Sequence, residues 1–377
     1  MSAEGFAVSV LLWLVGLFLM WKVPSPASKE RAEDRGSECP RVSIIIPARN
    51  EAQRISPLLA SLGRQTRRPH EIVVVDDCSS DGTSDVARRM GTTVLAGEPL
   101  PAGWTGKTWA CWQGAQHSTG ELLLFLDADT WLEPDALAEL VEEHECQMGL
   151  LTVQPYHVTS RVYEQLSAFF NIVLMAAINA FTPLRNVLRP GGGFGPCVIC
   201  SRKDYFRVGG HSSIKGHVLE DIAMAKRFLA HGVPVACYGG RGVISFRMYP
   251  AGLGDLIEGW SKGFGLGALS VHIPFLVLTV AWITGCFRVW VGLAQSVCAP
   301  AMPGIELHAF LYALYALQIR WMLVGIGRFR WWTPMVFPIP LVFFALIMLR
   351  SVILIHIWRR VKWKGRIVPT SRQETRR

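Results

Sequence analysis

Two carboxylates follow a continuous apolar run in the middle of the chain. Residues 122–126 are all apolar, and Asp127 and Asp129 come directly after them, one residue apart. Such a run is typical of a strand buried on both faces, and open α/β sheets bind ligands at the carboxyl ends of their strands. Alternate side chains of an extended chain point the same way, so both carboxylates can reach one site. Two hard oxygen ligands predict Mg²⁺ or Mn²⁺ carrying a diphosphate, although a solvated turn would have the same sequence.

Other charged side chains stand at the ends of further predicted elements. Asp76 and Asp77 end the strand predicted over residues 71–77, and neighbouring strand ends converge on one crevice in a doubly wound sheet. Lys107 follows the loop 103–106, from which its ammonium group would reach a phosphate; a surface lysine is the alternative.

A third pair of acids, Glu220 and Asp221, begins a helix predicted from the apolar spacing of residues 222–229. Acids are favoured at the N-terminus of a helix because of its dipole, so these two residues could simply stabilise the helix. A carboxylate held near apolar residues instead has its pKa raised, which makes it a useful general base.

Strand-like runs alternate with helical segments between residues 41 and 250, which predicts an α/β domain with a mostly parallel sheet. A glycine-rich loop, 189–196, leads into one of the later strands. Strands are predicted at 41–47, 71–77, 92–95, 121–126, 149–154 and 197–201, with 241–248 as the closing strand. Helices are predicted at 55–62, 107–116, 202–206, and after residues 83 and 133.

Three sequence blocks in this order resemble the family 2 glycosyltransferases. They are Ile44-Ile45-Ile46-Pro47-x-x-Asn50-Glu51, Val73-Val74-Val75-Asp76-Asp77-x-Ser79-x-Asp81-Gly82-Thr83 and Asp127-x-Asp129, and Glu220-Asp221 matches the ED motif of the same family. The resemblance covers about residues 42–247 and implies a GT-A fold and an inverting, nucleotide-sugar-dependent reaction, with a family preference for UDP.

The resemblance also implies roles for individual residues. Pro47, Glu51, Asp76 and Asp77 would hold the nucleoside, Asp127 and Asp129 would hold the metal and the diphosphate, and Asp221 would be the catalytic base beside Glu220. The Gln-x-x-Arg-Trp motif of processive members is absent from the sequence, which predicts a non-processive enzyme. In that region Trp260 and Lys262 could face a sugar and a phosphate, or be an interface aromatic residue and a snorkelling lysine.

The apolar residues concentrate at the N-terminus and in the last third, in a chain of 377 residues with a net charge of +9. This pattern predicts a multi-pass cell-membrane protein; a basic stripe with interleaved aromatics is lacking, so nucleic acid is not an expected partner. The predicted parts are an anchor at 1–24, a linker at 25–40, the GT-A domain at 41–250, a transmembrane region at 251–358 and a basic cytoplasmic tail at 359–377. Residues 6–21 favour an uncleaved anchor over a signal peptide, because no Lys or Arg precedes the apolar run.

The number of membrane crossings is ambiguous in the sequence. Residues 273–297, 305–327 and 332–358 are each long enough to span, but three crossings from a cytoplasmic domain would leave the basic tail outside. Either residues 264–297 hold two passes, or one segment is re-entrant, with Pro338 and Pro340 as a candidate break. The apolar stretch 166–181 fits either an interfacial helix or a buried core helix. Arg288, Arg320 and Arg350, within or near the spans, could meet a lipid headgroup, and snorkelling at a helix end explains Arg350 equally well.

Nine cysteines without an evident disulfide framework agree with a reducing, cytosolic environment. Cys197 and Cys200 have the spacing of half a zinc site, but they lie in an apolar run, which favours buried structural thiols.

The predicted function is metal-dependent transfer of a sugar from a nucleotide sugar to a membrane lipid or isoprenoid. The Gly103-Trp104-x-Gly106-Lys107 loop and the Trp363-Lys364-Gly365-Arg366 tail are similar to the carotenoid- and hopanoid-associated branch of family 2, and a polyprenyl phosphate would need the same architecture. The alternative is an inactive membrane module that binds a nucleotide sugar or a partner protein, but such a module would be expected to have lost one of the acidic residues. A transporter is disfavoured by the large α/β domain between the spans.

Overall fold

The computed structural model describes residues 2–26, 39–217, 219–268, 272–298, 304–353, 360–363 and 366–369. Most of the predicted linker, Val218 and most of the predicted tail lie outside these ranges, as does the side chain of Lys262.

A seven-stranded sheet with the order β3-β2-β1-β4-β8-β6-β9 forms the centre of the α/β domain. Strand β8 runs antiparallel to both of its neighbours, and the other neighbouring strands are parallel, which confirms the prediction of a mostly parallel sheet. The strands are β1 (Val42–Ala48), β2 (Glu71–Asp76), β3 (Thr93–Ala96), β4 (Leu122–Leu126), β6 (Leu150–Gln154), β8 (Cys197–Ser201) and β9 (Val235–Gly239).

Helices cover both faces of this sheet, so its central strands β1, β4 and β6 are buried along almost their whole length. Alternate residues of β4 enter two different hydrophobic clusters: Phe125 packs with α4 and α8, whereas Leu124 packs with α2 and α5. The helices of the domain are α2 (Ile55–Gly63), α3 (Thr83–Arg89), α4 (Gly106–His117), α5 (Ala136–Gln147), α6 (Ala168–Ala177), α7 (Arg202–Arg207) and α8 (Glu220–Ala230), with 3₁₀ helices η1 (Tyr163–Ser167) and η2 (Gly210–Ile214).

A second sheet has the order β11-β7-β10-β5. Its strands are β5 (Thr130–Leu132), β7 (Tyr156–Val158), β10 (Ile244–Phe246) and β11 (Gly327–Arg328). The sequence predicted that a strand at 241–248 closes the main sheet, and this prediction is wrong about the sheet to which the strand belongs. Strand β10 belongs to the second sheet, and β9 is the last strand of the main sheet, paired with β6. Short strands of similar composition differ only in their partners, which local sequence does not determine.

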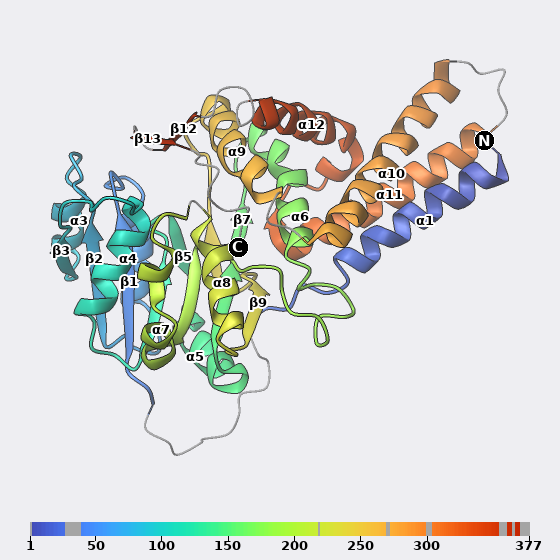
Figure 1. Cartoon of the computed structure of the whole chain (residues 1–377). Helices are drawn as coiled ribbons and strands as arrows, with labels where there is room; N and C mark the ends of the chain where they lie inside the picture. The colour runs from blue at the N-terminus through green and yellow to red at the C-terminus, as the bar shows by residue number, and fades with distance from the viewer. Residues whose placement is uncertain are drawn as a thin grey trace.

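Three apolar helices form an elongated bundle that projects from the α/β domain, with the N-terminus at its far end (Figure 1). Helices α10 (Ile273–Cys298) and α11 (Ile305–Ile326) are long and apolar enough to cross a membrane, as predicted. Helix α1 (Ala3–Leu19) is shorter and packs against both of them, so it is weaker support for the predicted anchor. Arg288 donates hydrogen bonds to Ser9 Oγ and to the Gly5 carbonyl, and so joins α10 to α1.

The predicted span at 332–358 is not a single long helix in the described part of the chain. That part consists of the 3₁₀ helix η3 (Thr333–Val336) and then α12 (Pro338–Ile353), whose 16 described residues pack against α9 (Leu253–Ala268). Pro338 is the first residue of α12, where its missing N–H costs nothing, so the predicted break is a helix start. Strands β12 (Arg360–Trp363) and β13 (Arg366–Pro369) form a two-stranded sheet.

Helix α6 is a core helix, which decides between the two alternatives for residues 166–181. Phe169 and Phe170 are fully buried. Trp260 stacks on Phe170 with a centroid distance of 4.6 Å and donates a hydrogen bond to Ser167 Oγ. Trp260 is therefore a core residue, and neither a sugar contact nor an interface aromatic.

Candidate active site

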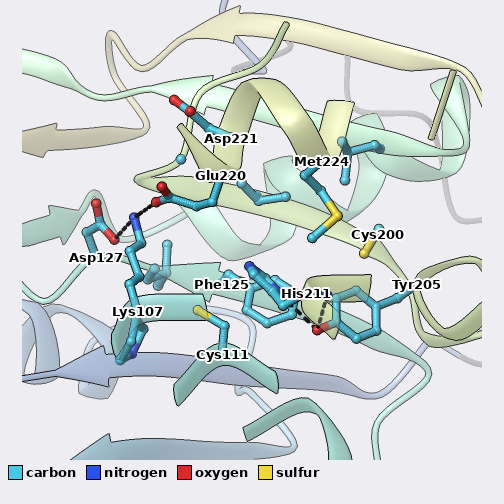
Figure 2. A pocket seen from close by; sticks show the side chains of 15 residues that line it. Lys107, Cys111, Phe125, Asp127, Cys200, Tyr205, His211, Glu220, Asp221 and Met224 are labelled. Atoms are coloured by element: carbon cyan, nitrogen blue, oxygen red, sulfur yellow. Dashed lines mark hydrogen bonds and ion pairs between the residues drawn. The ribbon is translucent and has the colours of Figure 1, made fainter. Parts of the chain in front are cut away.

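A pocket lies at the carboxyl ends of β1 and β4, closed on one side by the N-terminus of α8. Five of the predicted site residues line it (Figure 2), namely Pro47, Lys107, Asp127, Glu220 and Asp221. Its inner wall is mostly apolar and includes Phe125, Tyr205, His211 and Met224. Polar groups at the mouth and apolar groups inside are typical of a ligand site.

Lys107 connects the two acidic motifs. Its Nζ lies 2.7 Å from Asp127 Oδ1 and 2.9 Å from Glu220 Oε1. Burial alone would lower the pKa of Lys107, but Asp127 and Glu220 raise it well above its usual value. Helix α4 starts with Thr105 as N-cap, whose Oγ1 accepts from the Thr108 amide, and this places Lys107 in the first turn. Lys107 is thus an ion-paired residue of the pocket and not a surface lysine.

Asp127 and Asp129 follow β4 as predicted, in a turn held by main-chain hydrogen bonds. The Asp127 amide donates to the Pro196 carbonyl, and Thr130 donates to the Asp127 carbonyl through its amide and its hydroxyl. Burial raises the pKa of Asp129 to about 6, and the negative charges of Asp127 and Glu51 add to this increase.

This crowding of negative charge suits a divalent cation. Among the described residues, no group of three His, Cys, Asp or Glu side chains is placed to hold a metal ion. Mg²⁺ is commonly bound by one or two carboxylates, with substrate phosphates and water completing its shell, so Asp127 and Asp129 fit that pattern. A cation beside them would also relieve the repulsion that raises the pKa of Asp129.

The carboxylates after β2 are held in a separate network beside the pocket. Asp77 forms an ion pair of 3.2 Å with Arg49 Nη1, which also donates to the Asp77 carbonyl. Asp76 accepts hydrogen bonds from the Ser79 amide and the Ser84 hydroxyl, within its own turn.

The loop after β1 is joined to the loop after β2. The amide of the buried Glu51 donates to Thr83 Oγ1, and the Asn50 carboxamide accepts from the Ser80 amide. Asn50 has a φ of 53°, a left-handed conformation that asparagine tolerates better than most residues. The structure places Glu51 near enough to Asp129 for its negative charge to raise the pKa of Asp129. Asp76 and Asp77 instead organise the neighbouring loop through their hydrogen bonds and ion pair.

Asp221 lies at the start of α8, with its carboxylate turned away from Lys107 (Figure 2). Burial and the adjacent Glu220 raise the pKa of Asp221 to about 7, although the Ile222 amide donates to its Oδ1. The N-cap position of α8 is Leu219, which makes no side-chain capping hydrogen bond, so Glu220 and Asp221 are the acids of the first turn and Asp221 itself accepts from one of its amides. A carboxyl group with a pKa near neutrality can accept a proton in a reaction and release it afterwards.

The glycine-rich loop packs directly on these residues. A Cβ at Gly195 would lie 3.3 Å from Asp221 Cβ and 3.4 Å from Lys107 Nζ, so only glycine allows this approach without displacement. Farther along the loop, a Cβ at Gly191 would lie 3.0 Å from the ring of His272, the residue before α10. The loop thus connects the pocket to the base of the apolar bundle.

Several residues of the site were not predicted from the sequence. Arg49 and Arg54 supply positive charge next to Asp77 and Asp129, and His211 accepts or donates a 2.8 Å hydrogen bond with Tyr205 inside the pocket. Arg49 lies within the first of the three sequence blocks, between Pro47 and Asn50, and its position was the only signal available.

Two other sequence interpretations concern residues near the site. Cys197 and Cys200 are buried in β8, burial raises the pKa of both thiols, and all nine cysteines are free, so these two are structural thiols. Arg247, in the region where processive enzymes have their motif, forms a 2.7 Å ion pair with the buried Glu164.

Comparison with known proteins agrees with this architecture. The family described as "Glycosyl transferase family 2" matches residues 43–194, and "Glycosyl transferase family group 2" matches residues 122–362. The chain is 35% identical to the 4,4'-diaponeurosporenoate glycosyltransferase of Staphylococcus haemolyticus (strain JCSC1435), over 94% of this chain and 95% of that protein. The protein of the same name from Staphylococcus aureus (strain USA300) is also 35% identical, over 88% of this chain and 89% of its own length.

A solved structure supports the fold. The mannosyltransferase PcManGT from Pyrobaculum calidifontis, in complex with GDP-Man and Mn²⁺, superposes with a TM-score of 0.52 at 20% identity, over 92% of this chain and 96% of that chain. This likeness confirms the GT-A fold predicted from the sequence. Together with the 35% identity over most of the chain, it establishes that the protein belongs to the family 2 glycosyltransferases and is a glycosyltransferase.

Proposed function

We propose that the protein transfers a sugar from a nucleotide sugar, UDP-linked by family preference, to a carotenoid-type isoprenoid or another membrane lipid, in one inverting and non-processive step. The observation that carries this proposal is the bridge from Asp127 through Lys107 to Glu220, which holds the first aspartate of the Asp-x-Asp turn and the start of α8, with Asp221, around one pocket. The names of the relatives suggest the carotenoid acceptor.

Each residue has a defined task in this proposal. With a hydroxyl acceptor, Asp221 takes the proton as the acceptor oxygen forms its bond to the anomeric carbon. The bond from that carbon to the diphosphate breaks at the same time, and its electron pair leaves with the nucleoside diphosphate. Lys107 and Arg49 supply positive charge on the donor side of the pocket. A divalent cation held by Asp127 and Asp129 would neutralise the charge that develops on the diphosphate.

A carboxylate acceptor, which the name of the relatives implies, changes the task of Asp221. A carboxylate oxygen attacks without losing a proton, and the product is a glycosyl ester. An ionised Asp221 beside Glu220 would repel such an acceptor, whereas the protonated form would donate a hydrogen bond to it. The raised pKa of Asp221 makes the protonated form available near neutral pH. The two acceptor classes therefore require opposite protonation states of the same residue.

The arrangement of the helices supports one membrane topology in which the catalytic domain and the basic tail lie on the same side. Helices α10 and α11 leave the α/β domain and return to it, because α11 ends at β11, which pairs with β7 (Figure 1). If α1, α10 and α11 cross the bilayer and α12 does not, the chain after α12 remains on the side of the catalytic domain. The basic tail and the domain then both face the cytoplasm, in agreement with the positive-inside rule.

Transfer assays in lipid nanodiscs test the proposal. The purified protein is given Mn²⁺ or Mg²⁺, a panel of radiolabelled nucleotide sugars and, in separate assays, a C30 carotenoid acid, a polyprenyl phosphate or an isoprenoid alcohol that serves as the hydroxyl-type acceptor. Metal-dependent movement of the label into the organic phase, lost in Asp221→Asn with the hydroxyl-type acceptor, is the expected result. Nucleotide binding without transfer to any acceptor would favour the alternative of an inactive binding module. Absence of nucleotide binding would contradict the assignment of the site.

A further inference from the structure

Helix α12 is apolar, and its described part is shorter than a bilayer span. The 16 residues from Pro338 to Ile353 extend about 24 Å at 1.5 Å per residue, against a hydrocarbon core of about 30 Å. It starts ten residues after Arg328 of β11, so its N-terminal end is held close to the second sheet of the α/β domain.

One face of α12 is fixed to the protein. Leu341, Phe344 and Ile347 are buried, and Phe344 packs edge-to-face on Phe170 of α6. The Ser351 hydroxyl donates a 2.8 Å hydrogen bond to the Ser261 carbonyl of α9. These contacts determine which side of α12 faces outward.

The opposite face is a stripe of large exposed aliphatic side chains. Ile339, Val342, Leu346, Leu349 and Ile353 recur at helical spacing, and Ile339, Leu346 and Leu349 are each about 60% exposed. A continuous apolar stripe of this kind marks an interaction surface, since single exposed apolar residues would be scattered.

The surroundings of this stripe indicate a lipid surface. In Figure 1, α12 lies beside α9 and crosswise to the bundle of α1, α10 and α11, near the end where the bundle joins the domain. Arg328, Arg330 and Trp331 precede η3 and are exposed, and Arg350 is exposed in the last turn of α12. Arginine and tryptophan are the side chains that anchor segments at the level of the lipid headgroups.

We infer that α12 lies in the plane of the bilayer surface, with its aliphatic stripe in the lipid and Arg328, Arg330 and Arg350 toward anionic headgroups. This inference rests on the proposed function, in which α10 and α11 cross the same bilayer. In this position, α12 would hold the catalytic domain against the adjacent lipid leaflet, which is the leaflet that supplies an amphiphilic acceptor.

Depth-dependent fluorescence quenching tests this inference with the full chain. The four exposed cysteines, at positions 39, 78, 146 and 298, are replaced by serine, because the five buried ones are protected from labelling. Ile339→Cys, Val342→Cys, Leu346→Cys and Leu349→Cys are then labelled singly with bimane. The proteins are placed in nanodiscs of phosphatidylcholine and phosphatidylglycerol that carry a nitroxide either on the headgroup or midway along the acyl chain.

We expect the headgroup nitroxide to quench all four positions more strongly than the mid-chain nitroxide does. The four labels should also lie at similar depths in the bilayer. Leu317→Cys, at an exposed position near the middle of α11, is the matched control and should show the opposite preference. A depth that increases steadily along α12, with strong mid-chain quenching at Leu346, would mean that α12 spans and would overturn the inference.

Two further outcomes separate this inference from the proposed function. Strong quenching at Leu317 without any quenching on α12 would mean that a protein surface covers the stripe, which overturns the inference and leaves the spanning helices in place. Absence of quenching at Leu317 as well would overturn the proposed membrane attachment itself.

Discussion

The ionisation of Asp221 should control the rate of transfer near neutral pH. Its pKa of about 7 replaces the ordinary value of 3.8 because the carboxyl group is buried beside Glu220. The ionised fraction of such a group rises from about 0.09 at pH 6 to about 0.9 at pH 8, whereas an ordinary aspartate is about fully ionised at both. For a hydroxyl acceptor, which needs the ionised base, we expect kcat/KM to rise about tenfold over this range.

The substitution Asp221→Asn should lower kcat with a hydroxyl acceptor by about 10²–10⁴-fold, the usual contribution of a general base. With a carboxylate acceptor the pH dependence should reverse, and Asp221→Asn should keep most of the activity, because the amide still donates a hydrogen bond. Initial rates of label transfer at saturating metal measure both effects, and Asp85→Asn, which removes an exposed carboxylate that pairs with Arg88 on α3, is the matched control. A flat rate between pH 6 and pH 8 with every active acceptor would refute this reasoning.

Three further predictions follow from the contacts of the site and the core. Lys107→Met leaves two carboxylates without their shared cation and should lower the free energy of unfolding by about 3 kcal/mol, whereas Lys107→Arg should retain most of it; equal thermal stability of both variants would contradict the ion-pair account. Asp129→Asn should weaken Mn²⁺-dependent nucleotide binding about tenfold or more in calorimetric titrations. Binding measured with chelator present should not change, and an equal loss in both conditions would argue against a metal role. Trp260→Ala should cost about 3–5 kcal/mol of stability and Trp260→Phe about 1 kcal/mol, with KM for the donor unchanged in both, because this side chain packs in the core. A raised KM in Trp260→Phe would instead indicate contact with substrate.

The sequence was sufficient to predict an element and the side chains at its end wherever both depend on the same few neighbouring residues. Asp127 and Asp129 follow an apolar run that is typical of a buried strand and forms β4, and Glu220 and Asp221 begin a helix whose periodicity is clear. The pairing of Lys107 with Glu220 joins residues far apart in the chain, so it depends on how α4 and α8 pack and has no local signal.

The apolar segments show more directly what amino-acid composition cannot predict. Residues 332–358 have the hydropathy of a span, yet the described part forms η3 and the short α12, because hydropathy does not distinguish a lipid environment from a protein core. The same limit applies to α6, whose sequence fitted an interfacial helix equally well and whose aromatic residues are instead covered by α9, α10 and α12.

The second sheet explains how a pocket for a soluble donor can be held at a fixed height relative to the apolar bundle. Helix α11 ends directly at β11, which pairs with β7; β7 pairs with β10, and β10 pairs with β5. Strand β5 begins at Thr130, the residue after Asp129. A continuous set of main-chain hydrogen bonds therefore connects the base of a candidate membrane helix to the carboxylates proposed to hold the metal. Hydrogen-bonded strands transmit position better than a loop would, and the Gly191–Gly195 segment provides the second connection, from His272 to Asp221. For an acceptor that stays in the lipid, these two connections would set the distance between the bilayer and the reacting atoms.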